Sequence, residues 1–304
     1  MKVSVIIPTY HRSECIQRAV DSVLSQTLKD IEVIVVDDNG IGTPDGIATH
    51  GAMSKYKSCT NVIYVQHQKN MNGAVARNTG LKMAKGEYIS FLDDDDIYLP
   101  NRLEKLVNCL EKYDSSWGLC YSAYVKRMPN GSLQKSTENV EGDIFLQVLM
   151  RSYYLGSGAN IFVRREVIEK IGLFDETFKR NQDLEFLVRA TKDFKVAYVD
   201  EVLMEIFYDI RTSNLTYEEQ KKREKLFREK FSNYLTNLPV KESRAVTIMW
   251  DIDWIRLSLT SGKYFEAIKY MLKAKIPFKV YISYLSYIYD RYKNNISYGF
   301  FVRL

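Results

Sequence analysis

No stretch of this chain approaches the ~18 consecutive apolar residues that a membrane-spanning helix requires. The apolar run near the N-terminus ends at Thr9, which makes it too short for the hydrophobic core of an export signal. The four cysteines have no metal-type spacing, and none of the three histidines is spaced as a metal ligand. We therefore predict a cytoplasmic protein with free thiols and without a zinc site or a disulfide framework.

Two common phosphate-binding signatures are also missing. The chain has no P-loop, and no G-x-G-x-x-G follows a predicted strand, which argues against a kinase and against a dinucleotide oxidoreductase. The composition is that of an ordinary soluble protein, 46% hydrophobic and 27% charged. A chain of 304 residues is long enough to bury a sizeable core.

The net charge of +5 is unevenly distributed. Residues 263–304 carry eight Lys/Arg against two acids, and residues 217–262 carry nine against seven, so residues 1–216 are net negative. A negative body argues against a nucleic-acid-binding core. A basic tail instead predicts contact with an anionic surface.

Strand and helix patterns alternate through the first part of the chain. Short apolar segments rich in β-branched residues predict buried strands, and the segments between them have helical spacing. The predicted strands are VSVIIP (3–8), IEVIVVDDNG (31–40), which ends in acids and Asn-Gly, NVIYVQHQ (61–68), and the apolar start of YISFLDDDDIYLP (88–100). This alternation predicts an α/β fold with a mostly parallel sheet and helices on both faces.

The second half of the chain is less regular. The segment KVAYVDEVLMEIFYDIR (195–211) predicts a pair of strands, and the pattern is helical from about residue 217 onward. We predict an α/β domain over residues 1–216 and a helical, basic and aromatic C-terminal region over residues 217–304.

Polar residues follow three of the predicted strands, at positions 8–10, 37–39 and 93–96. Because parallel sheets bind ligands at the carboxyl ends of their strands, we expect these residues on one rim. Residues 93–96 are four consecutive aspartates, which repel one another and are costly to desolvate together. Helix capping accounts for one or two of them. A hard divalent cation, Mg²⁺ or Mn²⁺, shared with substrate phosphates is the functional alternative.

Five segments in this order resemble the family 2 nucleotide-sugar glycosyltransferases of the GT-A fold, in particular the bacterial members that build cell-surface polysaccharide. The resemblance covers roughly residues 2–216. It rests on VSVIIPTYHR, VIVVDDNG, NGAVARNTGL, GEYISFLDDDDIYLPNRLE and NQDLEFLVR. It implies a transferase that moves a sugar from a nucleotide-sugar, expected to be a UDP-sugar, to a surface-glycan or lipid-linked acceptor.

The resemblance also implies roles for residues of the nucleotide site. Pro8, Thr9 and Tyr10 would line the nucleotide pocket, and Asp38 would accept a hydrogen bond from the uracil. The alternative for Asp38 is a turn before Asn39-Gly40. Arg77 would face the nucleotide or the diphosphate, and its alternative is a solvated helix face.

The D-x-D motif of the family corresponds here to Asp93, Asp94 and Asp95. Asp95 is the expected metal ligand, Asp93 is expected to hold the ribose, and Asp94 occupies the variable middle position. Asp96 is expected to cap the helix that begins near Pro100.

Two positions depart from the family pattern. The catalytic base of the family is the second acid of a Glu-Asp pair, and here the pair is Gln182-Asp183. Asp183 would take the acceptor proton and give inversion at the anomeric carbon, although an N-cap for the following helix explains it equally well. Where the family often has a metal- or phosphate-binding His, this chain has Arg211, which would pair with a phosphate.

The last segment, residues 263–304, combines tyrosines with Lys and Arg. Two interpretations remain open: peripheral contact with the inner face of an anionic membrane, or packing of the helices on protein. For the whole chain, the leading hypothesis is a metal-dependent, inverting glycosyltransferase. The alternative is a non-catalytic nucleotide-sugar or glycan-binding module on the same fold, for which Gln182 and Arg211 are the best support.

Overall fold

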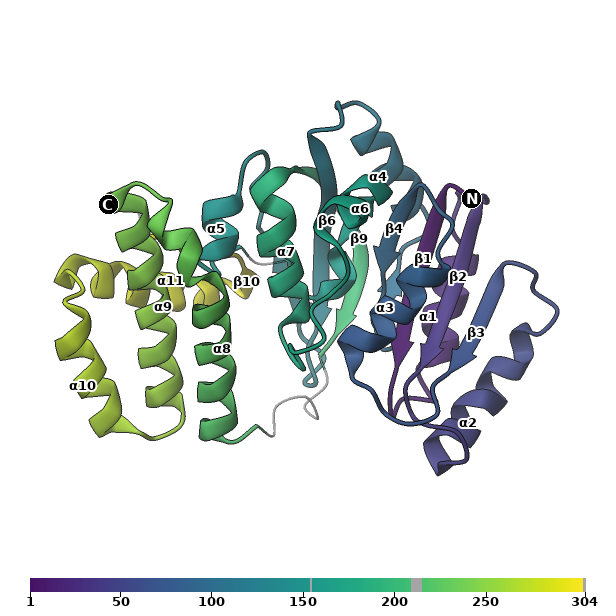
Figure 1. Cartoon of the computed structure of the whole chain (residues 1–304), viewed down its shortest axis with the longest axis horizontal. Helices are drawn as coiled ribbons and strands as arrows, with labels where there is room; N and C mark the ends of the chain where they lie inside the picture. Colours follow the sequence, from purple (N-terminus) through teal and green to yellow (C-terminus); the bar gives the residue numbers. More distant parts are fainter. Residues whose placement is uncertain (154, 209–214, 303–304) are drawn as a thin grey trace. The chain divides into compact units, whose positions relative to one another are not determined.

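The computed structural model describes residues 1–153, 155–208 and 215–302. The chain forms two compact units (Figure 1). The first contains Met1–Asp143 and Leu155–Tyr208, and the second contains Ile144–Tyr154 and Asp209–Leu304. Residues 144–154 belong to the second unit, although the sequence did not indicate this.

The first half of the first unit is a parallel sheet. Its strands are β1 (Val3–Thr9), β2 (Ile31–Asp37), β3 (Val62–Gln66) and β4 (Tyr88–Phe91). They pair in the order β4-β1-β2-β3, and all residues of β2 and β4 are buried. Strands buried on both faces are near-continuous apolar runs, which is the pattern that predicted them.

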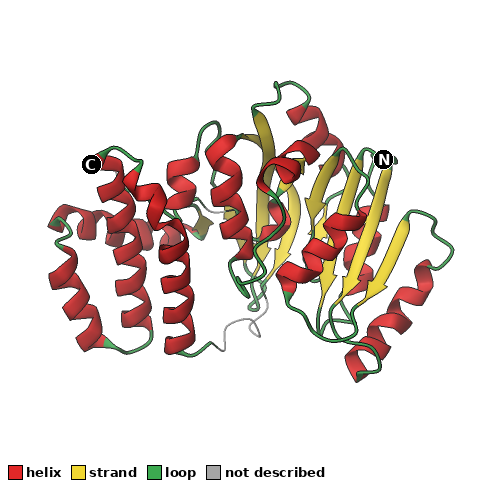
Figure 2. Cartoon of the chain, in the orientation of Figure 1, coloured by secondary structure: helices red, strands yellow, loops and turns green. Residues whose placement is uncertain are grey.

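Helices connect these strands in the order expected for a parallel sheet. They are α1 (Ile16–Leu24), α2 (Pro44–Met53) with the short 3-10 turn η1 (Ser54–Tyr56), and α3 (Gly73–Met83). Figure 2 shows helices on both faces of the strands. The α/β class predicted from the sequence is confirmed, and the parallel order brings the ends of β1, β2 and β4 to one rim.

The second half of the unit extends the sheet with mixed pairing. The elements are β5 (Ile97–Tyr98), α4 (Arg102–Leu110), β6 (Trp117–Arg127), β7 (Leu133–Ser136), η2 (Gly158–Asn160), β8 (Phe162–Arg164), α6 (Arg165–Ile171), α7 (Gln182–Asp193) and β9 (Lys195–Phe207). Strand β8 runs antiparallel to both β4 and β6, so it joins the two halves of the sheet.

The prediction of two paired strands after residue 195 was wrong. Strand β9 is one strand of 13 residues that runs parallel to β6. Ser122 pairs with Val199 and the next residue, Ala123, pairs with Val202, so the polar residues between them form a bulge. Asp200 and Glu201 therefore bend the strand without reversing it.

The second unit is helical. Its elements are α5 (Phe145–Leu149), α8 (Tyr217–Thr236), α9 (Val240–Thr260), α10 (Tyr264–Ala274), α11 (Phe278–Asn294) and the short strand β10 (Ile296–Ser297). Helix α9 lies between α8 and α10 (Figure 1). The indole of Trp250 donates a 2.8 Å hydrogen bond to the Leu149 carbonyl, which ties α5 to α9. Within the described residues, no helix is both long and apolar enough to cross a bilayer.

Candidate active site

The acids after β4 meet two other loops on the rim of the sheet. Asp93 accepts a 2.7 Å charged hydrogen bond from Arg77 of α3. The hydroxyl of Ser157 lies 3.1 Å from Asp93 Oδ2 and 3.2 Å from Asp96 Oδ2. The sequence placed Arg77 and Asp93 at the same site, and the structure brings them into direct contact.

Arg12, which the sequence analysis did not single out, is the main counter-charge of the cluster. Its guanidinium lies 2.9 Å from Asp94 Oδ1 and 3.0 Å from Asp95 Oδ2. Asp94 also accepts a 3.2 Å hydrogen bond from the Tyr10 amide. Asp94 therefore binds the loop after β1, while the ring of Tyr10 stays exposed. The sequence shows only a basic residue three positions after the end of β1, which has no distinctive spacing.

Asp96 does not cap a helix, so that prediction was wrong. One of its oxygens accepts a 3.0 Å hydrogen bond from the Phe207 amide at the end of β9, and the other faces Ser157. The N-cap position of α4 is Asn101. The carboxylate instead links the end of β4 to the end of β9.

Burial and mutual repulsion keep the aspartates from ionising easily. Burial raises the pKa of Asp94 and of Asp96, and Asp93 adds to the shift of Asp96. Burial together with the Asp93 charge raises the pKa of Asp95 to about 7. More negative charge is packed here than Arg12 and Arg77 neutralise.

Asp183 faces the same cluster from the first turn of α7. Asn181 occupies the N-cap position, so Asp183 is not the N-cap residue of α7. A Cβ placed on Gly158 would lie 3.1 Å from Asp183 Cβ and 3.4 Å from its Oδ2, so a larger residue here would press against this side chain. Burial raises the pKa of Asp183, and the nearby charges of Arg77 and Asp93 act on it in opposite directions.

Gln182 lies beside Asp183 and points toward α3. A Cβ on Gly73 would lie 2.9 Å from Gln182 Nε2 and 3.1 Å from Arg77 Nη1. The first turns of α3 and α7 therefore approach each other through a glycine. Arg77 stands between the D-x-D acids and the Gln182-Asp183 pair.

A buried arginine supports the Ser157–Asn160 turn from behind. Arg102 of α4 is fully buried, and it donates hydrogen bonds of 2.6 Å to Ser122 and 2.9 Å to Asn160. The ring of Tyr98 lies 4.6 Å from its guanidinium. This network fixes the turn that carries Ser157 and Gly158 against the acids.

Asp38 is buried and engaged by the protein itself. One oxygen accepts from the Met71 amide at 2.8 Å and contacts His67 at 2.7 Å, and the other accepts from the Asn72 amide and the Asn70 side chain, both at 2.9 Å. Each carboxylate oxygen thus has two partners. Asp38 anchors the loop that leads into α3, and its predicted contact with a base stays a prediction.

The remaining predicted residues lie near this rim or outside the described part of the chain. Pro8 is half-buried and Thr9 is buried at the end of β1. Arg211 lies outside the described residues. His67, for which we predicted no chemistry, orients Asp38 and Thr79.

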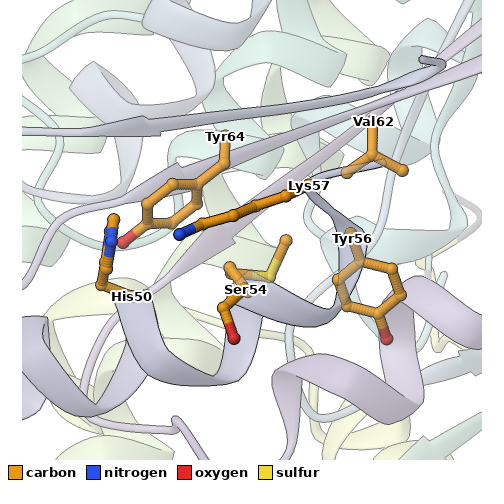
Figure 3. Close-up of a pocket in the computed structure, with 7 residues that line it drawn as sticks. His50, Ser54, Tyr56, Lys57, Val62 and Tyr64 are labelled. Carbon is orange, nitrogen blue, oxygen red and sulfur yellow. The ribbon is translucent and has the colours of Figure 1, made fainter. Parts of the chain in front are cut away.

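A separate cavity of about 200 Å³ lies between α2 and β3. Its lining includes His50, Lys57 and Tyr64, whose polar atoms point toward one another (Figure 3). The Tyr64 hydroxyl donates a 2.6 Å hydrogen bond to Asp37. None of the acids at 93–96 lines this cavity, so it is distinct from the acidic rim.

Comparison with known proteins agrees with this architecture. The model of glycosyl transferase family 2 matches residues 4–172. An uncharacterized glycosyltransferase of Rickettsia typhi is 32% identical over 249 residues, which cover 79% of this chain and 73% of the relative. The poly(ribitol-phosphate) β-N-acetylglucosaminyltransferase TarP of Staphylococcus aureus is 32% identical over 197 residues, covering 62% of this chain and 58% of TarP. The chain belongs to glycosyl transferase family 2, and it is a glycosyltransferase.

Solved structures show the same fold. The crystal structure of S. aureus TarS residues 1–349 with UDP-GlcNAc superposes with a TM-score of 0.63 at 20% identity, covering 81% of this chain and 70% of that one. The corresponding complex with UDP gives 0.57 at 18% identity, covering 90% and 89%. These likenesses establish a GT-A-like fold for this chain.

Proposed function

We propose that this glycosyltransferase uses a UDP-sugar donor and a divalent cation, and that it inverts the configuration of the transferred sugar. The acidic rim carries the proposal: two partly exposed carboxylates, Asp93 and Asp95, follow the end of β4, where Asp93 pairs with Arg77 and Asp95 with Arg12. The charges of Asp93 and Arg77 also act on Asp183. The donor class is supported by TarS, whose structures contain UDP and UDP-GlcNAc.

The donor set suits Mg²⁺ or Mn²⁺. These ions take one or two protein carboxylates and complete their shell with phosphate oxygens and water. Among the described residues, no three acidic, His or Cys side chains are arranged to hold an ion by themselves. Asp95, with Asp93 beside it, would hold the cation only together with a diphosphate. When bound, the cation supplies charge stabilisation to the departing nucleotide.

The residues around the cation would contact different parts of the donor. Arg77 and Arg12 lie against the acids, where either can turn a guanidinium toward phosphate oxygens. Arg211 would add a further phosphate contact. Pro8, Thr9 and the exposed ring of Tyr10 line the approach to the nucleotide from the end of β1.

Asp183 is the proposed general base. Its raised pKa suits a group that must take a proton from an acceptor hydroxyl, and Gly158 keeps the space in front of it free of a side chain. Attack by this hydroxyl on the face of the sugar opposite the leaving diphosphate gives inversion. The acceptor is proposed to be a surface glycan or a lipid-linked precursor; the name of TarP records a poly(ribitol-phosphate) acceptor for that relative.

UDP release with Mn²⁺ tests this proposal when it is measured for the wild type, for Asp183→Asn and for Asp193→Asn. Asp193 is the last residue of the same helix, so it controls for the substitution itself. We expect Asp183→Asn to abolish transfer while Asp193→Asn retains it. Equal rates for all three proteins would contradict the assignment of the base. A wild type that binds UDP-sugars but never transfers would favour the non-catalytic binding module.

A further inference from the structure

Helix α11 leaves a broad apolar stripe uncovered. Its exposed large side chains recur at spacings of three and four residues, so they lie on one side of the helix. They are Phe278, Ile282, Leu285, Tyr289 and Tyr292, with exposed fractions of 77%, 54%, 65%, 63% and 89%. Scattered exposed apolar residues are ordinary, but a continuous row of five marks a contact surface.

The opposite side of α11 already has its partners within the second unit. The ring centroid of Tyr284 lies 5.2 Å from that of Phe300, and that of Tyr287 lies 5.1 Å from that of Tyr298. The Tyr287 hydroxyl also donates a 2.9 Å hydrogen bond to the Tyr298 carbonyl. The exposed stripe is therefore on the side of α11 that does not pack against the second unit.

Helix α10 carries a similar stripe. Tyr264, Phe265, Ile268 and Leu272 are exposed there at helical spacing, while Ala267 is buried against the unit. We call the nine exposed residues of the two helices the α10–α11 face. Aromatic and branched aliphatic side chains together are typical of surfaces that enter the boundary between lipid headgroups and acyl chains.

The charges around this face are mostly positive. Residues 263–294 contain seven Lys/Arg and two acids. Lys269, Lys273, Lys275 and Lys279 are exposed, and among the described residues none of them forms an ion pair. The acids are engaged locally: Glu266 accepts a 2.7 Å hydrogen bond from Tyr217, and Asp290 accepts one of 2.7 Å from Tyr298.

We propose that the α10–α11 face docks the protein on the surface of an anionic phospholipid bilayer. The apolar stripes enter the headgroup boundary, and the four lysines meet the negative headgroups. The helices lie on the bilayer and do not cross it, because within the described residues no helix is apolar enough to do so. This inference rests on the second unit alone and does not depend on the proposed donor, metal or base.

Charge complementarity favours lipid over a second copy of the chain. A symmetric pairing of two such faces would bring their lysine sets toward each other, and like charges at an interface cost affinity. The nearby acids, Glu266 and Asp290, already accept hydrogen bonds from their own unit. An anionic bilayer can bind both features: its headgroups attract the lysines, and its headgroup boundary accommodates the apolar stripe.

Co-sedimentation of the full chain with vesicles tests the proposal. Vesicles of equal parts phosphatidylglycerol and phosphatidylcholine should retain the protein at low salt, and vesicles of phosphatidylcholine alone should retain it weakly. The double variant Ile282→Gln/Leu285→Gln removes apolar side chains that already face solvent, so the fold should survive. We expect it to weaken association roughly tenfold or more.

A second variant and a matched control separate the two contributions. Lys273→Gln/Lys279→Gln should weaken association by roughly thirtyfold and flatten its salt dependence, since each lysine near an anionic surface contributes about 1 kcal/mol. Ile47→Gln changes a residue of α2 that is 64% exposed, and it should have no effect. A thermal melt of each variant verifies folding.

Three results would overturn the proposal. The first is a folded wild type that stays in the supernatant with anionic vesicles at low salt. The second is an Ile282→Gln/Leu285→Gln variant that binds as well as the wild type. The third is an oligomer that sediments without lipid and that this variant dissociates, in which case a second copy occupies the α10–α11 face.

Discussion

The acidic rim of the first unit and the α10–α11 face of the second unit are both charged, but they treat their charges differently. The rim buries Asp94 and Asp96, leaves Asp93 and Asp95 partly exposed, and supplies counter-charges through Arg12 and Arg77. The α10–α11 face leaves its lysines exposed, with no ion pair among the described residues. From this difference we infer that the largely buried aspartates bind a small ligand and that the exposed lysines contact a membrane surface.

The largest effect is expected at the base. Asp183→Asn should lower the rate of sugar transfer by roughly 10³-fold, because a positioned general base contributes ~10²- to 10⁴-fold. The affinity for UDP with Mn²⁺ should be nearly unchanged, since the amide keeps the shape of the carboxylate. Parallel transfer assays and UDP titrations measure the two effects. A proportional loss of UDP affinity would place Asp183 in donor binding instead.

Asp95→Ala should act on the metal and not on the proton transfer. Loss of a charged partner at a desolvated site costs about 3 kcal/mol, so the Mn²⁺ concentration needed for half-maximal UDP release should rise by roughly 100-fold. A titration of activity with Mn²⁺ measures this. Vesicle association of the same variant should not change, which sharpens the distinction between the two charged regions. An unaltered Mn²⁺ requirement would contradict the role of Asp95.

Arg12→Met should destabilise the ligand-free protein. Arg12 contacts both Asp94 and Asp95, and removing one partner from a largely buried ion pair leaves charge uncompensated. We expect a loss of about 2 kcal/mol in the free energy of unfolding, measured by urea denaturation, and a partial recovery with Mn²⁺ and UDP. Lys279→Met, at an exposed lysine, is the control and should change stability by less than about 0.5 kcal/mol.

Stability should also depend on pH through Asp95. Its pKa is raised to about 7 in the folded protein, against ~3.9 in an unfolded chain. The folded state therefore holds a proton that the unfolded state has released, and the contribution of Asp95 to stability falls as pH rises from about 4 to 7. Asp95→Asn removes this titration. The difference between the melting temperatures of the variant and the wild type should shift in favour of the variant as the pH rises from 5 to 8. A difference that stays constant over this range would refute the assignment.

The smallest effect is expected for Gln182→Glu, which restores the acid pair common in the family. Gln182 already lies beside Arg77, and a new partly exposed ion pair is worth up to about 1 kcal/mol. The transfer rate should change by less than about fivefold. A gain of two orders of magnitude would mean that Gln182 impairs the site and would support the binding-module hypothesis for the wild type.

The sequence was informative where burial imposes a pattern. The apolar strands at 3–8, 31–37 and 88–92 are buried on both faces, so their composition alone predicted the parallel sheet and the rim. The acids after Leu92 were assigned to that rim for the same reason. The structure places Arg77 beside Asp93. The predicted contact of Arg77 with the nucleotide or the diphosphate stays a prediction.

Other features depend on contacts between distant segments, which no local pattern encodes. Arg12 was missed because its partners lie about eighty positions away, and a single arginine after a strand has no distinctive spacing. The Asp38 carboxylate accepts hydrogen bonds from the amides of Met71 and Asn72, and a turn-like Asp-Asn-Gly sequence does not predict these bonds. Nothing local indicated that residues 144–154 group with the C-terminal helices.

The central claim is that the acidic rim binds a divalent cation together with the diphosphate of the donor. Calorimetric titration of UDP into the wild-type protein, with and without Mn²⁺, tests it most directly. We predict that Mn²⁺ tightens UDP binding by at least roughly tenfold, because the ion neutralises carboxylates that otherwise repel the diphosphate. Equal affinity in the presence of Mn²⁺ and of a chelator would contradict the account.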